Sequence, residues 1–363
     1  MSEIRQGKGV IMQNELIAKV PPPHTITQNT LPCYKETGSL GLLQLKRMWH
    51  KVQLQKQGCA DKKIIEDEWS LDVMIMDTLG LGLTPTIESI FASDSFVEFE
   101  NWVKKVHGRV ISNAKINQLN KNIVSFFEKA DIKNEAVLVE TPRYSILTPL
   151  QWQSWDDNGY VIIPALVSKK LCEDVCNMLY ERLKMDKNNP ASWYSCHAHK
   201  QGIMVQIFND ITMQVIRSLP QVRDVFEQLW GRENLIVSTD RLSFNPPQTE
   251  SWQFPGPNLH WDINFNKPLT FATQGLLYLT DVAAEQGAFS CVPGFHKKID
   301  NWLANLPKNT NPHSFDFDKC HSTPLAAKAG SLIVWRHTLP HGSCPNKGSR
   351  PRIVQYINMA PLK

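Results

Sequence analysis

The sequence predicts an α+β fold, in which an N-terminal helical region precedes an antiparallel jelly roll with flanking helices. Two patterns support this prediction. Between about residues 39 and 130, apolar residues recur every three or four positions, which is the period of an amphipathic helix. After about residue 234, short β-rich runs are separated by Gly, Pro and Asn turns, with no helices alternating between them. Such strands favour a closed or two-sheet antiparallel arrangement over a parallel doubly wound sheet.

The composition divides the chain into three parts. Residues 1–36 contain a Pro-Pro-Pro run at 21–23 with polar flanks, which is typical of an extended or poorly ordered leader. Residues 37–146 form the helical accessory region. The character of the chain changes near residue 147, so we expect the jelly-roll domain to cover 147–363.

The elements of this second domain follow in order. Thr148-Pro149 predicts the start of a helix that runs through Trp155 and ends at Gly159, and Tyr160–Pro164 is expected to be a strand. A second amphipathic helix is expected at about 168–185. The later strands are expected within 235–244, 260–264, 275–282, 288–292, 331–335 and 352–360.

Charge and hydropathy exclude several classes of partner. The net charge of +4 is spread over 39 basic and 35 acidic residues without a run of five like charges, so binding to nucleic acid or a membrane surface is not indicated. No apolar stretch reaches the roughly 18 residues of a membrane span, and the first residues lack the apolar core of a secretory signal, so we expect a cytoplasmic protein. The eight scattered cysteines are interpreted as buried thiols in a reducing compartment. The expected partner is a small-molecule substrate, and a carrier protein or a homodimer stays open.

Two histidines and an aspartate have the spacing of a metal site. His260 and Asp262 are two residues apart, and on a strand these side chains project to the same face. His341 follows shortly after the expected strand at 331–335. Two histidines and one carboxylate are the ligands expected for non-haem Fe(II), because they leave positions open for other molecules. His337, four residues before His341, is an alternative third ligand.

An arginine at the start of the last expected strand suggests an anionic co-substrate. Arg352 would be costly to bury inside a small barrel unless it met an anion, and its planar fork suits a carboxylate. A dicarboxylate explains it well. Other candidates for polar contacts to a co-substrate or substrate are Asn245, Gln253, Gln274 and Tyr278; for the last three, a structural role is an equal alternative.

Five motifs in one order identify a family. After the His260-x-Asp262 pair come a run ending in an aspartate and an acidic turn (Leu279–Phe289), then Val292–His296, then His341-Gly342-Ser343 with Asn three residues on, and finally Arg352. This series resembles the phytanoyl-CoA dioxygenase family over roughly residues 148–361. The resemblance implies an Fe(II)- and 2-oxoglutarate-dependent oxygenase, which also uses O2, on a double-stranded β-helix core of the cupin-like type.

The resemblance also assigns roles to single residues. His260, Asp262 and His341 match the iron ligands, and Arg352 matches the arginine that binds the distal carboxylate of 2-oxoglutarate. The chain departs from the family pattern at Asn245, where the relative that names the family has lysine. It departs again two residues after Arg352, where valine replaces a frequent serine.

The expected reaction is hydroxylation of a C–H bond of a small molecule, with release of succinate and CO2. Since Asp262 is a carboxylate, no ligand position is left for chloride, so halogenation is disfavoured. Desaturation, epoxidation and ring closure remain alternatives that use the same site. Two different classes of protein also stay open: a non-catalytic jelly-roll binding protein, and a cupin-like metalloprotein that does not use 2-oxoglutarate.

Overall fold

The computed structural model describes residues 31–108, 111–128, 146–233, 235–256, 259–317 and 320–361. Most of the expected leader, including Pro21–Pro23, lies outside these residues. The described chain forms two compact units. The larger comprises the described parts of Tyr144–Leu229 and Asp240–Met359, and the smaller those of Glu15–Arg143, Trp230–Thr239 and Ala360–Lys363.

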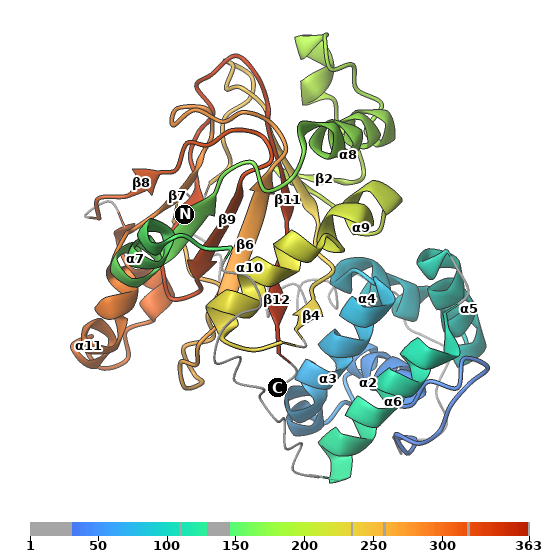
Figure 1. Ribbon diagram of the computed structural model, residues 1–363. Helices are drawn as coiled ribbons and strands as arrows, with labels where there is room; N and C mark the ends of the chain where they lie inside the picture. The colour runs from blue at the N-terminus through green and yellow to red at the C-terminus, as the bar shows by residue number, and fades with distance from the viewer. Residues whose placement is uncertain are drawn as a thin grey trace. The chain divides into compact units, whose positions relative to one another are not determined.

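The smaller unit is mainly helical (Figure 1). Its elements are α2 (Leu45–Lys56), α3 (Lys62–Leu79), α4 (Leu83–Ala92), α5 (Phe96–His107), α6 (Asn113–Glu128) and the short strand β4 (Ile236–Val237). Local sequence sets the ends of α3: the Asp61 carboxylate accepts a hydrogen bond from the Lys63 amide, and Gly80 ends the helix with a φ of 73°. The apolar positions at helical spacing meet in one core, which includes Leu45, Ile75, Phe99 and Ile123.

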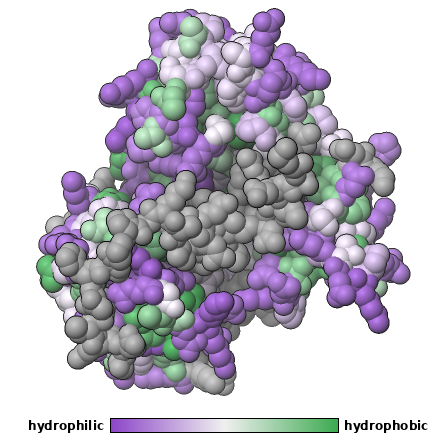
Figure 2. Space-filling model, turned by 180° about the vertical axis from the view of Figure 1, so that it is seen from behind, coloured by the Kyte–Doolittle hydropathy of each residue, from purple (hydrophilic) through white to green (hydrophobic). Residues whose placement is uncertain are grey.

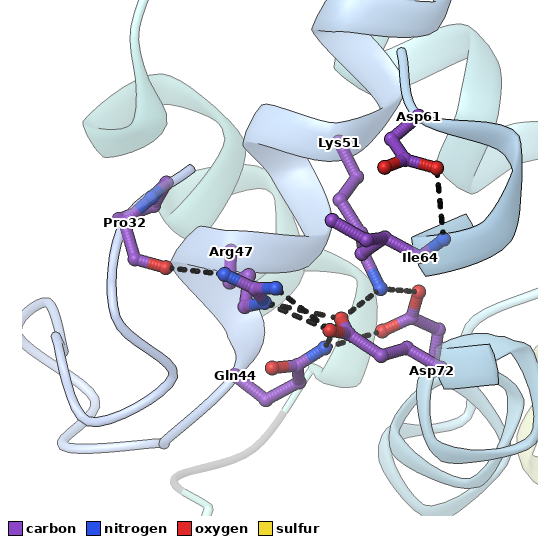
Figure 3. A network of polar contacts seen from close by, with 8 residues as sticks. Pro32, Gln44, Arg47, Lys51, Asp61, Ile64 and Asp72 are labelled. Atoms are coloured by element: carbon purple, nitrogen blue, oxygen red, sulfur yellow. Dashed lines mark hydrogen bonds and ion pairs between the residues drawn. The ribbon is translucent and has the colours of Figure 1, made fainter. Parts of the chain in front are cut away.

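A network of charged side chains is buried between α2 and α3 (Figure 3). Lys51 Nζ lies 2.6 Å from a carboxylate oxygen of Glu68 and 2.5 Å from one of Asp72. Arg47 binds the same Glu68 carboxylate at 2.8 Å, and the Gln44 amide donates to both acids. The two positive and two negative charges balance, as buried charges must if they are to stay ionised.

The larger unit carries most of the strands. Its helical elements are α7 (Pro149–Asn158), α8 (Lys169–Arg182), η1 (Pro190–Tyr194), α9 (Ile211–Arg217), α10 (Pro220–Trp230), η2 (Phe295–Lys297), α11 (Ile299–Ala304) and η3 (Pro312–Ser314). Its strands are β1 (Tyr160–Ile163), β2 (Lys200–Gln201), β3 (Met204–Val205), β5 (Leu242–Asn245), β6 (Thr273–Tyr278), β7 (Phe289–Cys291), β8 (Thr323–Pro324), β9 (Leu332–Arg336), β10 (His341–Ser343) and β11 (Arg352–Tyr356). In β12 (Met359–Ala360), Met359 belongs to the larger unit and Ala360 to the smaller. As expected, Thr148 caps α7 in a capping box and Gly159 ends it.

Strands β1 to β3 and β5 to β11 form two antiparallel sheets, which confirms the mixed helix-and-sheet class. The major sheet has the order β1-β9-β6-β11-β5-β3-β2, and β6, β9 and β11 run side by side at its centre (Figure 1). The minor sheet has the order β10-β7-β8. The expected runs at 235–244 and 352–360 are each interrupted: the first gives β4 and β5, and the second gives β11 and β12.

The apolar core of the larger unit includes side chains from both sheets. Phe289 of β7 packs on Trp335 of β9 with ring centroids 4.3 Å apart. On β6, alternation places Leu276 and Tyr278 toward this core, and Gly275 on the opposite face. A Cβ on Gly275 would lie 2.5 Å from the Ile357 carbonyl oxygen and 3.1 Å from the Phe226 ring of α10, so only glycine fits there.

The cysteines differ in exposure, which corrects the expectation that all eight are buried. Cys172, Cys176 and Cys291 are buried, whereas Cys33, Cys59 and Cys196 are exposed, and all eight are free thiols. Cys172 and Cys176 lie on the inner side of α8, where burial raises the pKa of their thiols to about 11 and about 12. The three exposed cysteines instead lie outside the helices and strands, where no apolar face covers them.

Hydrophilic side chains cover most of the described surface seen in Figure 2, with apolar side chains scattered between them. Within the described residues, the helices are all too short or too polar to cross a membrane.

Candidate metal centre

Two backbone hydrogen bonds join the segments that carry the predicted ligands. The His260 amide donates to the His341 carbonyl oxygen at 2.8 Å, and the His341 amide donates to the His260 carbonyl oxygen at 2.9 Å. His341 is the first residue of β10, rather than a residue in the loop after β9. An antiparallel bridge of this kind brings the two histidine side chains close together, with ring centroids 4.8 Å apart.

The prediction of a strand at 260–264 is wrong, although His260 and Asp262 still project to the same side, as they would on a strand. Only His260 makes a bridge, and the following residues have no ladder partner. The segment still alternates, with Trp261 and Ile263 buried and Asp262 exposed. The Trp261 ring is held in the core, where its Nε1–H donates to the Thr338 carbonyl oxygen at 2.9 Å. The buried tryptophan therefore anchors the segment in place of a sheet ladder.

The three predicted ligand side chains converge. His260 Nε2 lies 3.6 Å from Asp262 Oδ1, and His341 Nε2 lies 3.4 Å from Asp262 Oδ2. One ligand atom from each residue lies within 4.8 Å of the others. The side chains of His260 and Asp262 are 38% and 45% exposed, whereas that of His341 is 6% exposed. The group therefore opens to solvent on the side of His260 and Asp262.

Hydrogen bonding sets the tautomer of one histidine. His341 Nδ1 lies 2.9 Å from the Leu339 carbonyl oxygen, which can only accept, so Nδ1 carries the hydrogen. Nε2 then faces Asp262 Oδ2 at 3.4 Å and is the nitrogen that would bind an ion. A backbone carbonyl that fixes the ring of a metal-binding histidine is a common feature of such sites.

The Asp262 carboxylate is held in its ionised form. Desolvation by the surrounding protein acts to raise its pKa, but the hydrogen bond from His341 and the charges of His260 and His341 outweigh it, and the pKa lies well below its usual range. An ionised carboxylate beside two imidazoles is a donor set that suits a divalent metal such as Fe(II). The residues present therefore fit the implied ion.

The alternative ligands are not in this group. His337 Nδ1 lies 3.1 Å from the Ala272 carbonyl oxygen, and His296 Nε2 lies 3.1 Å from the Asp156 carbonyl oxygen. The partly buried His197 and the exposed His199 form a separate ring pair. Within the described residues, His260, Asp262 and His341 are the set of three side chains close enough to share an ion.

Arg352 is buried at the start of β11 and makes contacts with two hydroxyl groups. It is 0% exposed. Its Nη1 donates to Ser243 Oγ at 3.0 Å and its Nη2 donates to Ser343 Oγ at 2.7 Å, while Nε is buried without a partner. Among the described residues, no carboxylate forms an ion pair with Arg352. A buried guanidinium with spare donors fits an anionic ligand.

The other predicted polar contacts lie in different places. Asn245 is opposite Arg352 in the β5–β11 register and is 0% exposed, and its Oδ1 has no partner. The Tyr278 hydroxyl donates to the Leu325 carbonyl oxygen at 2.8 Å and accepts from the Phe289 amide, and burial raises the pKa of Tyr278 to about 12. Gln253 is exposed and bonds Thr249 within its own turn. Only Asn245 is therefore placed beside Arg352 with a free polar atom.

Several residues of the site were missed by sequence reasoning or given another role. Ser343 and Ser243 hold Arg352, and a signal existed for both. Ser343 lies two residues after His341 on one strand, and Ser243 lies two residues before Asn245 on another, so each shares a face with a candidate site residue. Gln274 was a candidate for a direct ligand contact, with a structural role as the alternative. Its Nε2 instead donates to Asp262 Oδ2 at 2.8 Å, and Trp335 donates to its other end.

Comparisons with known proteins agree with the sequence motifs. The phytanoyl-CoA dioxygenase family matches residues 155–354. A putative phytanoyl-CoA dioxygenase of Dictyostelium discoideum is 23% identical over 262 residues, which cover 58% of this chain and 74% of that protein. The Ava biosynthesis cluster protein O of Aspergillus versicolor is 25% identical over 233 residues, covering 56% of this chain and 75% of the relative. Among solved structures, the epimerase SnoN in complex with Fe3+, α-ketoglutarate and nogalamycin RO is similar with a TM-score of 0.42, 16% identity and coverage of 58% of this chain and 82% of SnoN.

Proposed function

The chain belongs to the phytanoyl-CoA dioxygenase family, and from this premise we propose that it is an Fe(II)- and 2-oxoglutarate-dependent dioxygenase that hydroxylates a C–H bond of a small molecule, releasing succinate and CO2. The family uses Fe(II), 2-oxoglutarate and O2. In this chain, His260, Asp262 and His341 are assigned as the metal ligands and catalytic centre, and Arg352 as the residue that binds the distal carboxylate.

The observation that carries the proposal is the link between the metal group and Arg352. His341 and Ser343 are two residues apart on β10, so their side chains share one face, and Ser343 Oγ accepts from Arg352 Nη2 at 2.7 Å. One strand therefore connects a metal ligand to a buried cation. A molecule with a chelating group at one end and a carboxylate at the other, such as 2-oxoglutarate, satisfies both.

The residues of the chain then have distinct tasks. When bound, Fe(II) supplies the redox chemistry that couples O2 to the oxidation of 2-oxoglutarate and substrate. Arg352 binds and orients the distal carboxylate, and Ser243 and Ser343 hold the guanidinium in position. Asn245, next in register, is proposed as a further contact of the co-substrate through the second hydrogen of its Nδ2 amide, whose first hydrogen goes to the Cys344 carbonyl oxygen, because 2-oxoglutarate offers only acceptors. For Tyr278, we propose an indirect contribution through the position of β7, because its hydroxyl hydrogen is already used.

The side of the site that faces the core excludes water. The rings of Phe289 and Trp335 pack around His341, with centroids 6.0 and 5.0 Å from its ring. The side of His260 and Asp262 is exposed, so a substrate is expected to approach there. Because Asp262 occupies a ligand position with a carboxylate, hydroxylation is favoured over halogenation.

The proposal extends to the architecture. We infer that the two antiparallel sheets are the halves of a double-stranded β-helix, since they share one core and the metal ligands lie at its rim. We also propose that residues 37–146 are an accessory region to the domain at 147–363.

Desaturation, epoxidation and ring closure at the same site depend on where the substrate lies and are outcomes of the assay below.

The test uses the full chain purified without metal. With Fe(II), ascorbate, O2 and 2-oxoglutarate, a library of small molecules is screened for succinate by mass spectrometry. A substrate that raises succinate formation, and that gains one oxygen atom, supports hydroxylation. His260→Ala should abolish both signals and lower the bound iron. Iron binding with no succinate from any substrate would favour the cupin-like metalloprotein, and the absence of both would favour the binding protein.

A further inference from the structure

The Asp262 carboxylate has little support from its own backbone. His260 is fixed by its bridge to His341, and Trp261 is fixed in the core. Asp262 follows them on a segment without a ladder partner, and its side chain is 45% exposed. A carboxylate in such a position can rotate among several rotamers, so its orientation must come from a neighbouring side chain.

Gln274 is that neighbour. It lies on the same face of β6 as Leu276 and Tyr278, and its Nε2 donates to Asp262 Oδ2 at 2.8 Å. This hydrogen bond occupies one acceptor position of the carboxylate and restricts its rotation. The remaining lone pairs stay directed toward the histidines, since Oδ1 lies 3.6 Å from His260 Nε2.

Trp335 determines which end of the Gln274 amide faces Asp262. The two residues are direct partners in the β6–β9 register, and the indole Nε1–H donates to Gln274 Oε1 at 3.1 Å. An indole nitrogen can only donate, so it selects the oxygen of the amide and leaves the NH2 group for the carboxylate. The same indole ring packs beside His341, with centroids 5.0 Å apart.

We propose that the Gln274–Trp335 pair is a positioning unit that sets the geometry and affinity of the metal centre. Trp335 orients Gln274 by its N–H group, Gln274 orients the Asp262 carboxylate, and the indole ring supports His341 directly. This inference rests on the proposed function, because it assumes that the triad binds a divalent metal. Residues that orient metal ligands in this way affect metal affinity by about 10- to 100-fold.

The experiment measures metal binding by the full chain without turnover. Co(II) is titrated into metal-free protein by calorimetry, and the Co(II) absorption spectrum is recorded at saturation as a signature of ligand geometry. Gln274→Met keeps the length of the side chain and loses both hydrogen bonds. It should weaken Co(II) binding by about tenfold or more and alter the spectrum. Trp335→Phe keeps an aromatic ring beside His341 and loses only the N–H group, and it should act in the same direction by a smaller factor.

The double variant tests the order of action. If Trp335 acts through Gln274, its N–H group is useless once the amide is gone. Gln274→Met with Trp335→Phe should therefore bind Co(II) no more than about threefold more weakly than Gln274→Met alone, which is less than the product of the single effects. Fully multiplicative effects would show that the two residues act separately and would overturn the positioning unit.

Matched controls separate positioning from general destabilisation. Trp193→Phe removes an indole hydrogen bond to the Asp186 carbonyl oxygen, and Gln355→Met removes an amide bond to the Met213 carbonyl oxygen, both from buried residues outside the site. These controls should lower the melting temperature without changing Co(II) affinity or spectrum. One outcome refutes only the positioning unit: wild type binds Co(II) and His260→Ala does not, but Gln274→Met binds Co(II) like wild type. If wild type binds no Co(II) or Fe(II), the proposed function fails as well.

Discussion

Replacement of Arg352 by methionine should separate ligand binding from folding. The guanidinium is 0% exposed, its two hydrogen bonds go to serine hydroxyls, and its Nε has no partner. Removing it eliminates two charged hydrogen bonds, each of which contributes about 1.5–3 kcal/mol to the free energy of unfolding. It also removes the desolvation penalty of a buried charge, which is several kcal/mol. Because these contributions oppose one another, we expect the free energy of unfolding to change by less than about 2 kcal/mol.

The affinity for 2-oxoglutarate should change far more. Truncating one partner of a buried, hydrogen-bonded charge pair costs about 2–5 kcal/mol. The lower value already weakens binding by about 30-fold, since each 1.4 kcal/mol is a factor of ten. Arg352→Lys keeps the charge without the planar fork and should give an intermediate loss.

The assay is an anaerobic calorimetric titration of 2-oxoglutarate into Co(II)-loaded protein, with urea unfolding of the metal-free protein alongside. Arg217→Met is the matched control, because Arg217 is also buried and donates to the Phe208 and Asp240 carbonyl oxygens. By the same balance of lost hydrogen bonds and relieved desolvation, that variant should change the free energy of unfolding by a similarly small amount, and it should keep its affinity for 2-oxoglutarate. Binding of 2-oxoglutarate by Arg352→Met within about threefold of wild type would refute the assigned role, and so would an equal loss of affinity in Arg217→Met.

Three further predictions concern the charged network, the third ligand and the thiols. Lys51→Met leaves the buried Asp72 carboxylate without its cation, while Glu68 keeps Arg47, and should lower the free energy of unfolding by about 3–5 kcal/mol in urea. Lys46→Met, in a more exposed pair, should have little effect. His341→Ala should abolish stoichiometric Fe(II) binding in an anaerobic assay and His337→Ala should not; the reverse result would make His337 the ligand. With Ellman's reagent, the exposed thiols should react in the native protein. The buried thiols of Cys172, Cys176 and Cys291 should react only after unfolding, because burial raises their pKa to between about 11 and about 12.

The sequence predicted the elements whose signals are local. The capped helix that begins after Thr148 and ends at Gly159 follows from three residues at its ends. The strands at the centre of the major sheet follow from short apolar runs between turns. The alternation of burial around Trp261 was also predictable, and it brought His260 and Asp262 to the same side even though no strand forms there.

Contacts between distant segments were beyond sequence reasoning. Nothing near Gln274 indicates that it faces Asp262 rather than a ligand, because this depends on the β6–β9 register and on the path of an irregular segment. In the same way, Gln253 was an equally plausible polar residue in sequence, but its amide is used within its own turn. The serines that hold Arg352 come from two strands, and only folding brings them together.

The backbone bridge between His260 and His341 has a consequence for how metal binding relates to folding. The two residues are far apart in sequence, and closing the chain between them costs entropy. That entropy is already lost on folding, when the amides and carbonyls of the two residues pair. A bound ion therefore closes no further loop of chain between the two histidines. Metal should be removable by a chelator and restored without unfolding, so the enzyme can exchange its ion at nearly constant structure.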